Sequence, residues 1–443
     1  FMRRFMTQEM NLEKEDMYQI DGPLDMTVFF GFCGIKGYNH LRYPEAHPHS
    51  PWSMLELKRT PETNIFDMIR EKDLLIHLPY ESFDESVVNF LYSAANDKDV
   101  LAIKQTLYRV SSSSPVVQAL EKAVQNGKQV TVLMEVKARF DEANNILMAR
   151  RLEKAGAHVI YGLVGLKTHS KCTLVIRREK DGIRRYVHVA TGNYNASTAK
   201  LYTDLGILTC NDRFGIDASA FFNLLSGYSD PPIWDSFIVA PINLRQRCIE
   251  LIDREIHFAK NGEDAHMIAK MNSLLDKGII EKLYEASQAG VKIELIVRGI
   301  CVLIPGIPGV SDNITVRSIV GRFLEHSRIF WFRNGGREEL YISSADWMPR
   351  NLNDRVELMV PIEDPEIKRR LKQMVDIELS DNQKAHIMQA DGTWLKTISA
   401  ENQLCAQEYF QKIAEKRDAE DEMTLAQKLE PYTPVLGHGD GSD

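Results

Sequence analysis

The chain has 443 residues, of which 44% are hydrophobic and 26% charged, and its formal net charge is −8 at pH 7. This is a globular composition, and at about 150 residues per domain the length suits two to four domains. It excludes collagen-like and fully disordered chains. No apolar run approaches the roughly 20 residues of a membrane span, and the start FMRRFMTQEM lacks a signal-peptide apolar stretch. Scattered cysteines without a CxxC pair predict reduced thiols and a cytoplasmic protein.

Two basic runs stand out against the acidic average. Residues 167–185 carry a local charge of +5, and residues 317–337 carry +4. Basic residues gathered in this way favour an anionic partner, although a solvated hairpin is the simpler alternative for any one run. Each run also contains a histidine between strand-like apolar residues, which favours the anionic partner.

Regular secondary structure is predicted from about Asn64 onward. Residues 1–57, rich in proline, histidine and aromatic residues near their end, are interpreted as the remnant of a preceding domain. The periodicity of apolar residues then predicts, in chain order, a strand over 100–108, a loop over 111–115, a helix over 116–127, a strand over 130–136, a helix over 143–155, and strands over 158–163, 173–176 and 186–190.

The second half of the chain repeats this order. The helix and strand predicted over 279–297 follow their first-half counterparts by 163 positions, and His326 follows His169 by 157. The repeat predicts two copies of one α/β unit, each with a mixed, largely parallel sheet covered by helices on both faces. We expect a first catalytic domain over 58–236, a second over 237–420, and an acidic flexible tail over 421–443.

The repeated histidine segments carry the chemistry. In His169-Ser170-Lys171 the first and third side chains of a strand point to the same side, so an imidazole and an ammonium face one site. A neutral imidazole can attack phosphorus, and the ammonium can neutralise the phosphoryl oxygens. His326 and Arg328 offer the same pair in the second copy. A core or surface histidine is the simpler interpretation of one such motif, but the duplication favours a shared cleft.

Polar residues at predicted strand ends add to this cleft. Asn193 and Asn195 end the strand after His169, and arginines follow strands in both copies: Arg109, Arg139 and Arg298. Arginine forks at the matching edge of both units suit bidentate phosphate binding, with ion pairs to nearby glutamates as the alternative. The sequence has no P-loop motif, no protein-kinase motifs and no zinc motif.

At this level of detail the chain resembles a known family. The stretches DVLAIKQTLYRV, VTVLMEVKARFDE, GLKTHSK, YVHVATGNYNASTAKLYTDLG and NDRVELMVPI resemble the C-terminal catalytic part of bacterial polyphosphate kinase and, more remotely, the phospholipase D superfamily. The resemblance implies two tandem phospholipase D-like α/β domains related by pseudo-twofold symmetry. It also implies an N-terminal helical domain and a head domain before them in the longer family members.

The resemblance also implies roles for single residues. His169 would be the phosphorylated nucleophile and His326 an acid or base. Tyr202, Arg298 and His326 match ATP-contacting positions, and Arg109 and Arg139 match a magnesium site. Because a guanidinium has no lone pair to offer, we expect these two arginines to clamp phosphates that themselves hold Mg²⁺.

The chain departs from the phospholipase D pattern at two positions. The acidic residue expected five positions after Lys171 is Ile176, and after Arg328 it is Arg333. Loss of these carboxylates implies a cleft with fewer anions, which suits a polyanionic substrate.

The expected function is therefore a reversible, Mg²⁺-dependent transfer of the ATP γ-phosphate to inorganic polyphosphate through a phosphohistidine. ATP, ADP and polyphosphate are the expected partners, basic patches near the cleft would line the polymer's path, and no specific nucleic acid is expected. The full-length form is expected to be a homo-oligomer, with peripheral contact to the inner membrane surface left open. Alternatives are a phospholipase D-type phosphodiesterase, a non-catalytic polyanion-binding fragment, and a structural duplication with core histidines.

Overall fold

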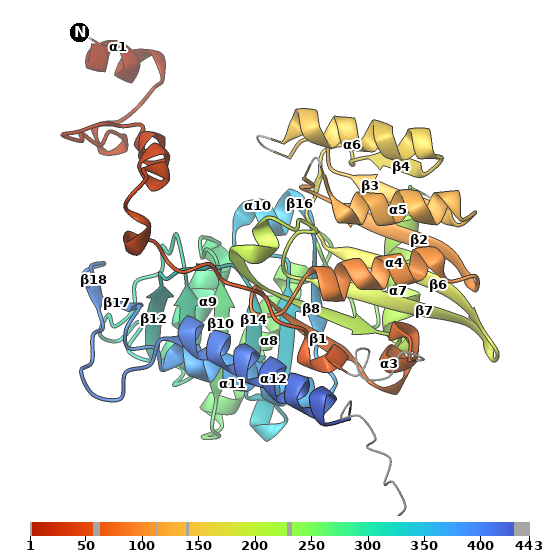
Figure 1. The fold of residues 1–443 in the computed structure, drawn as a ribbon. Helices are drawn as coiled ribbons and strands as arrows, with labels where there is room; N and C mark the ends of the chain where they lie inside the picture. Colours follow the sequence, from red (N-terminus) through yellow and green to blue (C-terminus); the bar gives the residue numbers. More distant parts are fainter. Residues whose placement is uncertain (1, 56–62, 112, 139–140, 228–232, 429–443) are drawn as a thin grey trace, which may run out of the picture. The chain divides into compact units, whose positions relative to one another are not determined.

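The computed structural model describes residues 2–55, 63–111, 113–138, 141–227 and 233–428, and the chain divides into two compact units after Ala46. The first unit holds helix α1 (Met2–Glu9) followed by short 3-10 turns, and none of its described residues is buried. The second unit contains both expected α/β domains (Figure 1). Residues 47–55, which the sequence assigned to the preceding domain, belong to this unit, where Ser50 and Met54 are buried.

The first half of the second unit is built on one twisted sheet. Its strands run in the spatial order β1-β8-β7-β6-β2-β3-β4. The strands are β1 (Leu74–Leu78), β2 (Val100–Leu107), β3 (Gln129–Met134), β4 (His158–Tyr161), β6 (Cys172–Glu179), β7 (Gly182–Ala190) and β8 (Tyr202–Thr209). The helices are α3 (Ile65–Glu71), α4 (Asn89–Asn96), α5 (Pro115–Gln125), α6 (Glu142–Ala155) and α7 (Asp212–Leu225).

The second half is built on another sheet. Its strands run in the order β18-β17-β12-β11-β10-β14-β15-β16, with β9 also paired to β16. The strands are β9 (Ile238–Ala240), β10 (His266–Met271), β11 (Lys292–Val297), β12 (Ile314–Ile319), β14 (Ile329–Phe332), β15 (Glu339–Ser343), β16 (Arg355–Pro361), β17 (Ala385–Met388) and β18 (Trp394–Lys396). The helices are α8 (Leu244–Lys260), α9 (Lys277–Gln288), α10 (Pro349–Asn353), α11 (Pro365–Leu379) and α12 (Ala406–Lys428).

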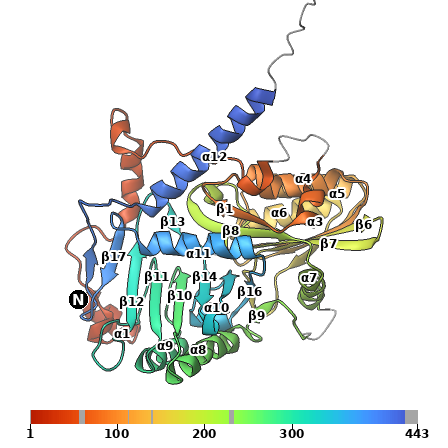
Figure 2. The same cartoon turned by 90° about the horizontal axis from the view of Figure 1, so that it is seen from below.

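Helices cover both faces of each sheet, as expected for the fold class. In Figure 2, α3 to α6 lie on one face of the first sheet and α7 on the other, while α11 and the pair α8 and α9 flank the second sheet. Each half buries its own apolar core, with Phe90 and Ile103 in the first and Ile252 and Leu295 in the second. None of the helices in the described part of the chain combines the length and apolar character needed to span a bilayer.

Helix α5 shows how local sequence sets these elements. The Ser114 side chain accepts a hydrogen bond from the Val117 backbone N–H and caps the helix, while Pro115 occupies its first turn, where the missing N–H costs nothing. The helix buries an apolar face that includes Val116 and Leu120. The sequence pattern predicted this helix, and the strands on either side of it, to within two residues.

The expectation of a largely parallel sheet is wrong. Parallel pairing is found for β2-β3-β4 and for β10-β11-β12, where a helix connects β2 to β3 and β10 to β11. By contrast, β6 and β7 are joined directly at Glu179 and Gly182, and they pair antiparallel, as do β7 with β8 and β14 with β15. A short turn can join antiparallel strands, whereas a parallel pair needs a long crossover.

The predicted flexible tail over 421–443 falls partly within α12. This helix continues to Lys428, so residues 421–428 are helical. The remainder, 429–443, lies outside the described residues.

Candidate active site

The two histidine segments cross between the sheets. Strand β5 (Lys167–Thr168) comes from the first half but pairs parallel with β16 of the second sheet. Strand β13 (Leu324–Glu325) comes from the second half but pairs parallel with β8 of the first sheet. His169 directly follows β5, and His326 directly follows β13. The histidine of each half therefore lies beside a strand of the other half.

His169 is held by a carboxylate from the second half. Its Nδ1 lies 2.9 Å from Glu357 Oε1, and its backbone N–H donates to the Val356 carbonyl at 2.9 Å. The Tyr108 ring packs edge-on against the imidazole with 4.7 Å between centroids. The His169 residue is 7% exposed, and its Nε2 has no hydrogen-bond partner among the described residues. The contact with Glu357 therefore leaves Nε2 as the ring atom available to a substrate.

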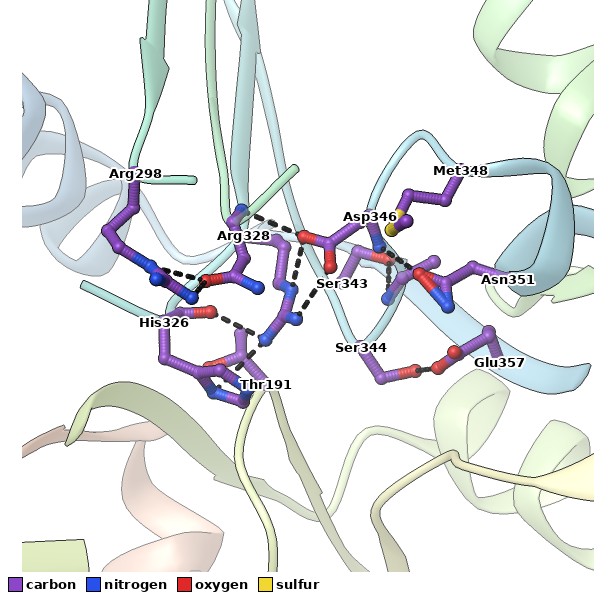
Figure 3. Close-up of polar contacts among 12 residues, drawn as sticks. Thr191, Arg298, His326, Arg328, Ser343, Ser344, Asp346, Met348, Asn351 and Glu357 are labelled. Carbon is purple, nitrogen blue, oxygen red and sulfur yellow. Dashed lines mark hydrogen bonds and ion pairs between the residues drawn. The ribbon is translucent and has the colours of Figure 1, made fainter. Parts of the chain in front are cut away.

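His326 is held in the same way by the first half. Its Nδ1 lies 2.9 Å from Asp204 Oδ1, and the Thr191 hydroxyl donates to that oxygen at 2.6 Å. In the pair formed by His169 and Glu357, the Ser344 hydroxyl likewise donates to Glu357 Oε2 at 2.5 Å, as Figure 3 shows. Each histidine is thus backed by a carboxylate, and each carboxylate by a hydroxyl.

Asp204 and Glu357 were missed by the sequence reasoning. If 356–362 is aligned with 205–211, Glu357 stands opposite Gly206. Asp204 precedes Glu357 by 153 residues, and Thr191 precedes Ser344 by the same number. Moving the alignment of the two halves by two positions would have placed the two acids opposite each other. The expectation that the cleft had lost its carboxylates is therefore wrong, because β8 and β16 supply them.

Lys171 and Arg328 are buried beside their histidines. Lys171 Nζ donates to the His169 carbonyl, and Arg328 Nη1 donates to the His326 carbonyl at 2.5 Å. Arg328 also forms a two-pronged contact with Asp346, with 3.0 and 3.1 Å between nitrogen and oxygen. Both side chains thus stabilise the histidine segments. Arg328 places positive charge close to the rings, whereas burial lowers the pKa of Lys171 to about 7, so this amine adds its charge only while it is protonated.

The other predicted residues have different surroundings. Arg298 donates to the side-chain oxygen of Asn272 at 2.6 and 2.9 Å. Arg109 Nε lies 3.0 Å from an Asp141 oxygen. The Tyr202 ring lies 5.3 Å from the His326 ring. Arg139 lies outside the described residues.

Asn193 and Asn195 differ in their hydrogen bonds. Asn195 accepts hydrogen bonds from the backbone N–H groups of Ser197 and Thr198, at 3.0 and 3.1 Å, and so closes a local turn. Asn193 stands where Asp346 stands in the second half, and its side-chain oxygen has no partner among the described residues. Asn193 therefore keeps a buried amide oxygen without a hydrogen bond among the described residues, and its contact with substrate stays a prediction.

Burial and nearby charges shift the pKa values of the two histidine–carboxylate pairs differently. Burial, together with Lys171, lowers the pKa of His169 well below its usual value, so the ring is neutral at pH 7. Burial raises the pKa of Glu357 to about 7. Burial alone would raise the pKa of Asp204 too, but contacts with His326 and Thr191 lower it. A neutral histidine on one side and an ionised aspartate on the other suit two different roles.

The basic runs do not form one positive surface at this site. Arg177 lies toward the far end of β6, a strand of eight residues that at 3.3 Å per residue is about 25 Å long. Its guanidinium pairs with Asp97 at 3.0 Å and Glu179 at 2.6 Å, and Arg333 pairs with Glu338 at 3.1 Å. Local carboxylates neutralise these two arginines, so neither is suited to line a polymer path, and the expectation of basic patches along that path stays a prediction for the other members of the two runs.

Comparison with known proteins identifies the family. Residues 64–231 match the family model of polyphosphate kinase C-terminal domain 1, and residues 237–407 match that of C-terminal domain 2. Together they cover well over half of the chain.

Relatives and a solved structure agree with these models. A polyphosphate kinase of Halalkalibacterium halodurans is 56% identical over 85% of this chain and 53% of its own length, and that of Thermosynechococcus vestitus is 50% identical over 89% and 56%. The crystal structure of polyphosphate kinase from Porphyromonas gingivalis matches with a TM-score of 0.82 at 35% identity, covering 95% of this chain and 63% of that one. This match confirms the fold class of two tandem α/β domains. The chain spans about half the length of its curated relatives, and it belongs to the polyphosphate kinase family.

Proposed function

We propose that this chain carries the phosphotransfer site of a polyphosphate kinase, which moves the γ-phosphate of ATP to the end of inorganic polyphosphate through phosphorylated His169. The observation that carries the proposal is the contact between His169 Nδ1 and Glu357, which leaves Nε2 as the nucleophile. A histidine with a buried carboxylate on one nitrogen presents its lone pair on the other.

The first step forms a phosphoramidate. The Nε2 lone pair of His169 attacks the γ-phosphorus in line, the N–P bond forms, and the bond from phosphorus to the bridging oxygen breaks with its electron pair leaving on ADP. Arg328, and Lys171 while it is protonated, add positive charge close to the reacting centre. Positioning and charge neutralisation supply most of the catalysis in such a transfer.

The second step lengthens the polymer. A terminal oxygen of polyphosphate attacks the phosphorus, the N–P bond breaks, and His169 returns to its neutral form. His326, whose Nδ1 faces the ionised Asp204, is suited to hold or release a proton at Nε2 for the attacking and leaving oxygens. The same steps in reverse would make ATP from ADP.

Magnesium enters this proposal as part of the nucleotide. Among the described residues, no three His, Cys, Asp or Glu side chains gather into a metal-binding group. Arg109, which the resemblance places at the magnesium site, has no lone pair and pairs with Asp141. We therefore assign Mg²⁺ to the ATP phosphates, with Arg109, Arg139 and Arg298 as phosphate clamps and Tyr202 as an ATP contact.

Incubation with γ-labelled ATP tests the proposal. Acid-labile label should stay on the chain, vanish in His169→Ala and persist in the control His158→Ala, whose histidine is exposed on β4. Addition of polyphosphate should then discharge the label into longer polymer. Hydrolysis of a phosphodiester without labelling would instead support the phosphodiesterase alternative, and polyphosphate binding without labelling or ADP formation would support a non-catalytic module.

A further inference from the structure

A cavity of about 460 Å³ opens between α11 and α12. This volume lies within the range of about 300–1,000 Å³ that is typical of small-molecule sites. The residues that line it include none of the candidate active-site residues. Its walls combine aromatic rings with polar groups: Trp52, Tyr80, Tyr409, Phe410, His77 and Arg370.

His77 and Tyr80 line this cavity, and neither the His77 ring nitrogens nor the buried Tyr80 hydroxyl has a hydrogen-bond partner among the described residues. His77 is 6% exposed, and its ring packs against the rings of Tyr80 and Phe410 with centroids 4.7 and 5.1 Å away. Burial lowers its pKa well below the usual value, so the ring is neutral and offers one donor and one acceptor. A buried polar group without a partner is costly, and a ligand with complementary nitrogens would satisfy it.

Guanidinium groups give the same cavity stacking faces and positive charge. Arg417 lies over the Trp52 ring at 5.0 Å, and Arg370 pairs with Glu81 at 2.7 Å. The other lining carboxylate, Asp376, is already paired with Lys372 at 2.7 Å. The four charged residues of the lining, Glu81, Arg370, Asp376 and Arg417, sum to zero, but Lys372 neutralises Asp376 from outside the lining and so leaves two guanidinium groups facing the single carboxylate of Glu81. The wall therefore favours a flat ring that bears an anionic group.

Helix α12 connects this cavity to His326. Gln407, in the first turn of α12, donates to Glu325 Oε1 at 2.6 Å and to the Phe323 carbonyl at 2.9 Å. The same side chain accepts from the Phe323 backbone N–H at 3.0 Å. Glu325 immediately precedes His326, so a change in the position of α12 acts directly on the segment that carries this histidine.

We propose that the cavity between α11 and α12 binds a nucleotide-class ligand, a flat heteroaromatic base that carries a phosphate, and that its occupancy is sensed at His326 through Gln407. The base would lie between the aromatic walls and satisfy His77, while the phosphate would meet the guanidinium groups. This site is separate from the phosphotransfer site, and its occupation can be measured without any turnover.

Calorimetric titration with adenosine monophosphate tests the proposal. Ala414 lines the cavity and the adjacent Glu415 is exposed, so Ala414→Trp fills the cavity while Glu415→Trp makes the matched control. Loss of one well-stacked ring corresponds to about a tenfold weaker Kd, and Ala414→Trp should reach at least that. Glu415→Trp should bind like the unsubstituted chain. No binding by the unsubstituted chain, or equal binding by Ala414→Trp, would overturn the proposal.

Two further measurements guard against a variant that fails to fold. Arg370→Gln keeps the cavity open but removes a charge, so it should weaken the monophosphate and leave adenosine unaffected. Hydrogen exchange in the unsubstituted chain should slow at residues 321–326 and in α12 when the monophosphate is bound. The opposite pattern would contradict the proposal. If Arg298→Ala loses binding while Ala414→Trp and Arg370→Gln keep it, the ligand occupies the phosphotransfer site.

Discussion

Glu357 Oε1 lies 2.9 Å from His169 Nδ1, although 188 residues separate the two in the sequence. The mirrored contact joins Asp204 and His326, which are 122 residues apart. Each half of the chain thus supplies one histidine and the carboxylate that orients the other histidine. We infer that neither half forms a working phosphotransfer site alone.

Glu357→Gln tests the orienting role directly. The amide would donate to Nδ1 and move the ring proton to Nε2, where it blocks attack. Loss of a comparable carboxylate from a histidine-based site costs about 10⁴-fold in rate, and we expect labelling by ATP to slow by about 10²–10⁴-fold. The exposed Asp354→Asn is the matched control. Labelling of Glu357→Gln at the unsubstituted rate would contradict the role given to this carboxylate.

The rate of labelling should rise with pH around neutrality. Burial raises the pKa of Glu357 to about 7. Above that pH the ionised carboxylate accepts the Nδ1 proton and leaves the Nε2 lone pair exposed; below it the protonated carboxyl donates to Nδ1 and shifts the ring proton to Nε2. Burial also lowers the pKa of Lys171 to about 7, so its charge is lost over the same range. Rapid-quench measurements between pH 5.5 and 8.5 on Lys171→Arg, which keeps the charge, should therefore give a midpoint at about 7. A rate that falls over this range would show that another group controls the step.

Gly192→Ala should impair the site through Asp204. A Cβ on Gly192 would stand 2.1 Å from Asp204 Oδ2, so the carboxylate would be pushed away from His326. Such overpacking costs about 1–3 kcal/mol of stability, and we expect turnover to fall by at least tenfold. Gly31→Ala, where an added Cβ meets nothing within 4 Å, is the control. Steady-state assays and urea unfolding would check both effects, and unchanged turnover would show that Asp204 tolerates displacement.

Lys270 should be important for stability. Its ammonium is 2% exposed and lies between Glu325, at 2.7 Å, and Glu378. Lys270→Met would leave two buried carboxylates facing each other, which should lower the free energy of unfolding by about 3–5 kcal/mol. Burial raises the pKa of Glu378 to about 7, so this carboxyl can take up a proton and the loss should be smaller at pH 6 than at pH 8.

Urea denaturation at both pH values measures that difference. Adding Glu378→Gln to Lys270→Met should recover part of the lost stability. Lys277→Met, whose side chain is 88% exposed, should change little. An equal loss at the exposed and buried lysines would contradict the burial argument.

Much of the fold follows from local sequence. The apolar spacing from Val116 to Gly127 and the run from Val130 to Val136 predicted α5 and β3, because amphipathic helices and buried strands have strong periodicities. The repeat then predicted two α/β units and a pair of histidines.

The crossing of the two halves could not be predicted in this way. Strands β5 and β13 have two residues each, too few for any periodic pattern, and they pair with strands of the other half. Asp204 and Glu357 are single acids within strands that are rich in apolar residues, and their partners are more than 100 residues away. Long-range pairing of this kind depends on tertiary packing, which local propensity does not encode.

The ring nitrogen that carries the phosphate decides whether His169 acts as the nucleophile through Nε2. Chain labelled with ¹⁵N-histidine, exposed to ATP and studied by ¹⁵N–³¹P correlation spectroscopy, reports which ring nitrogen bonds to phosphorus. We expect a bond to Nε2 of His169, absent in His169→Ala and much reduced in Glu357→Gln. Phosphate on Nδ1 of His169, or on any other residue, would contradict this expectation.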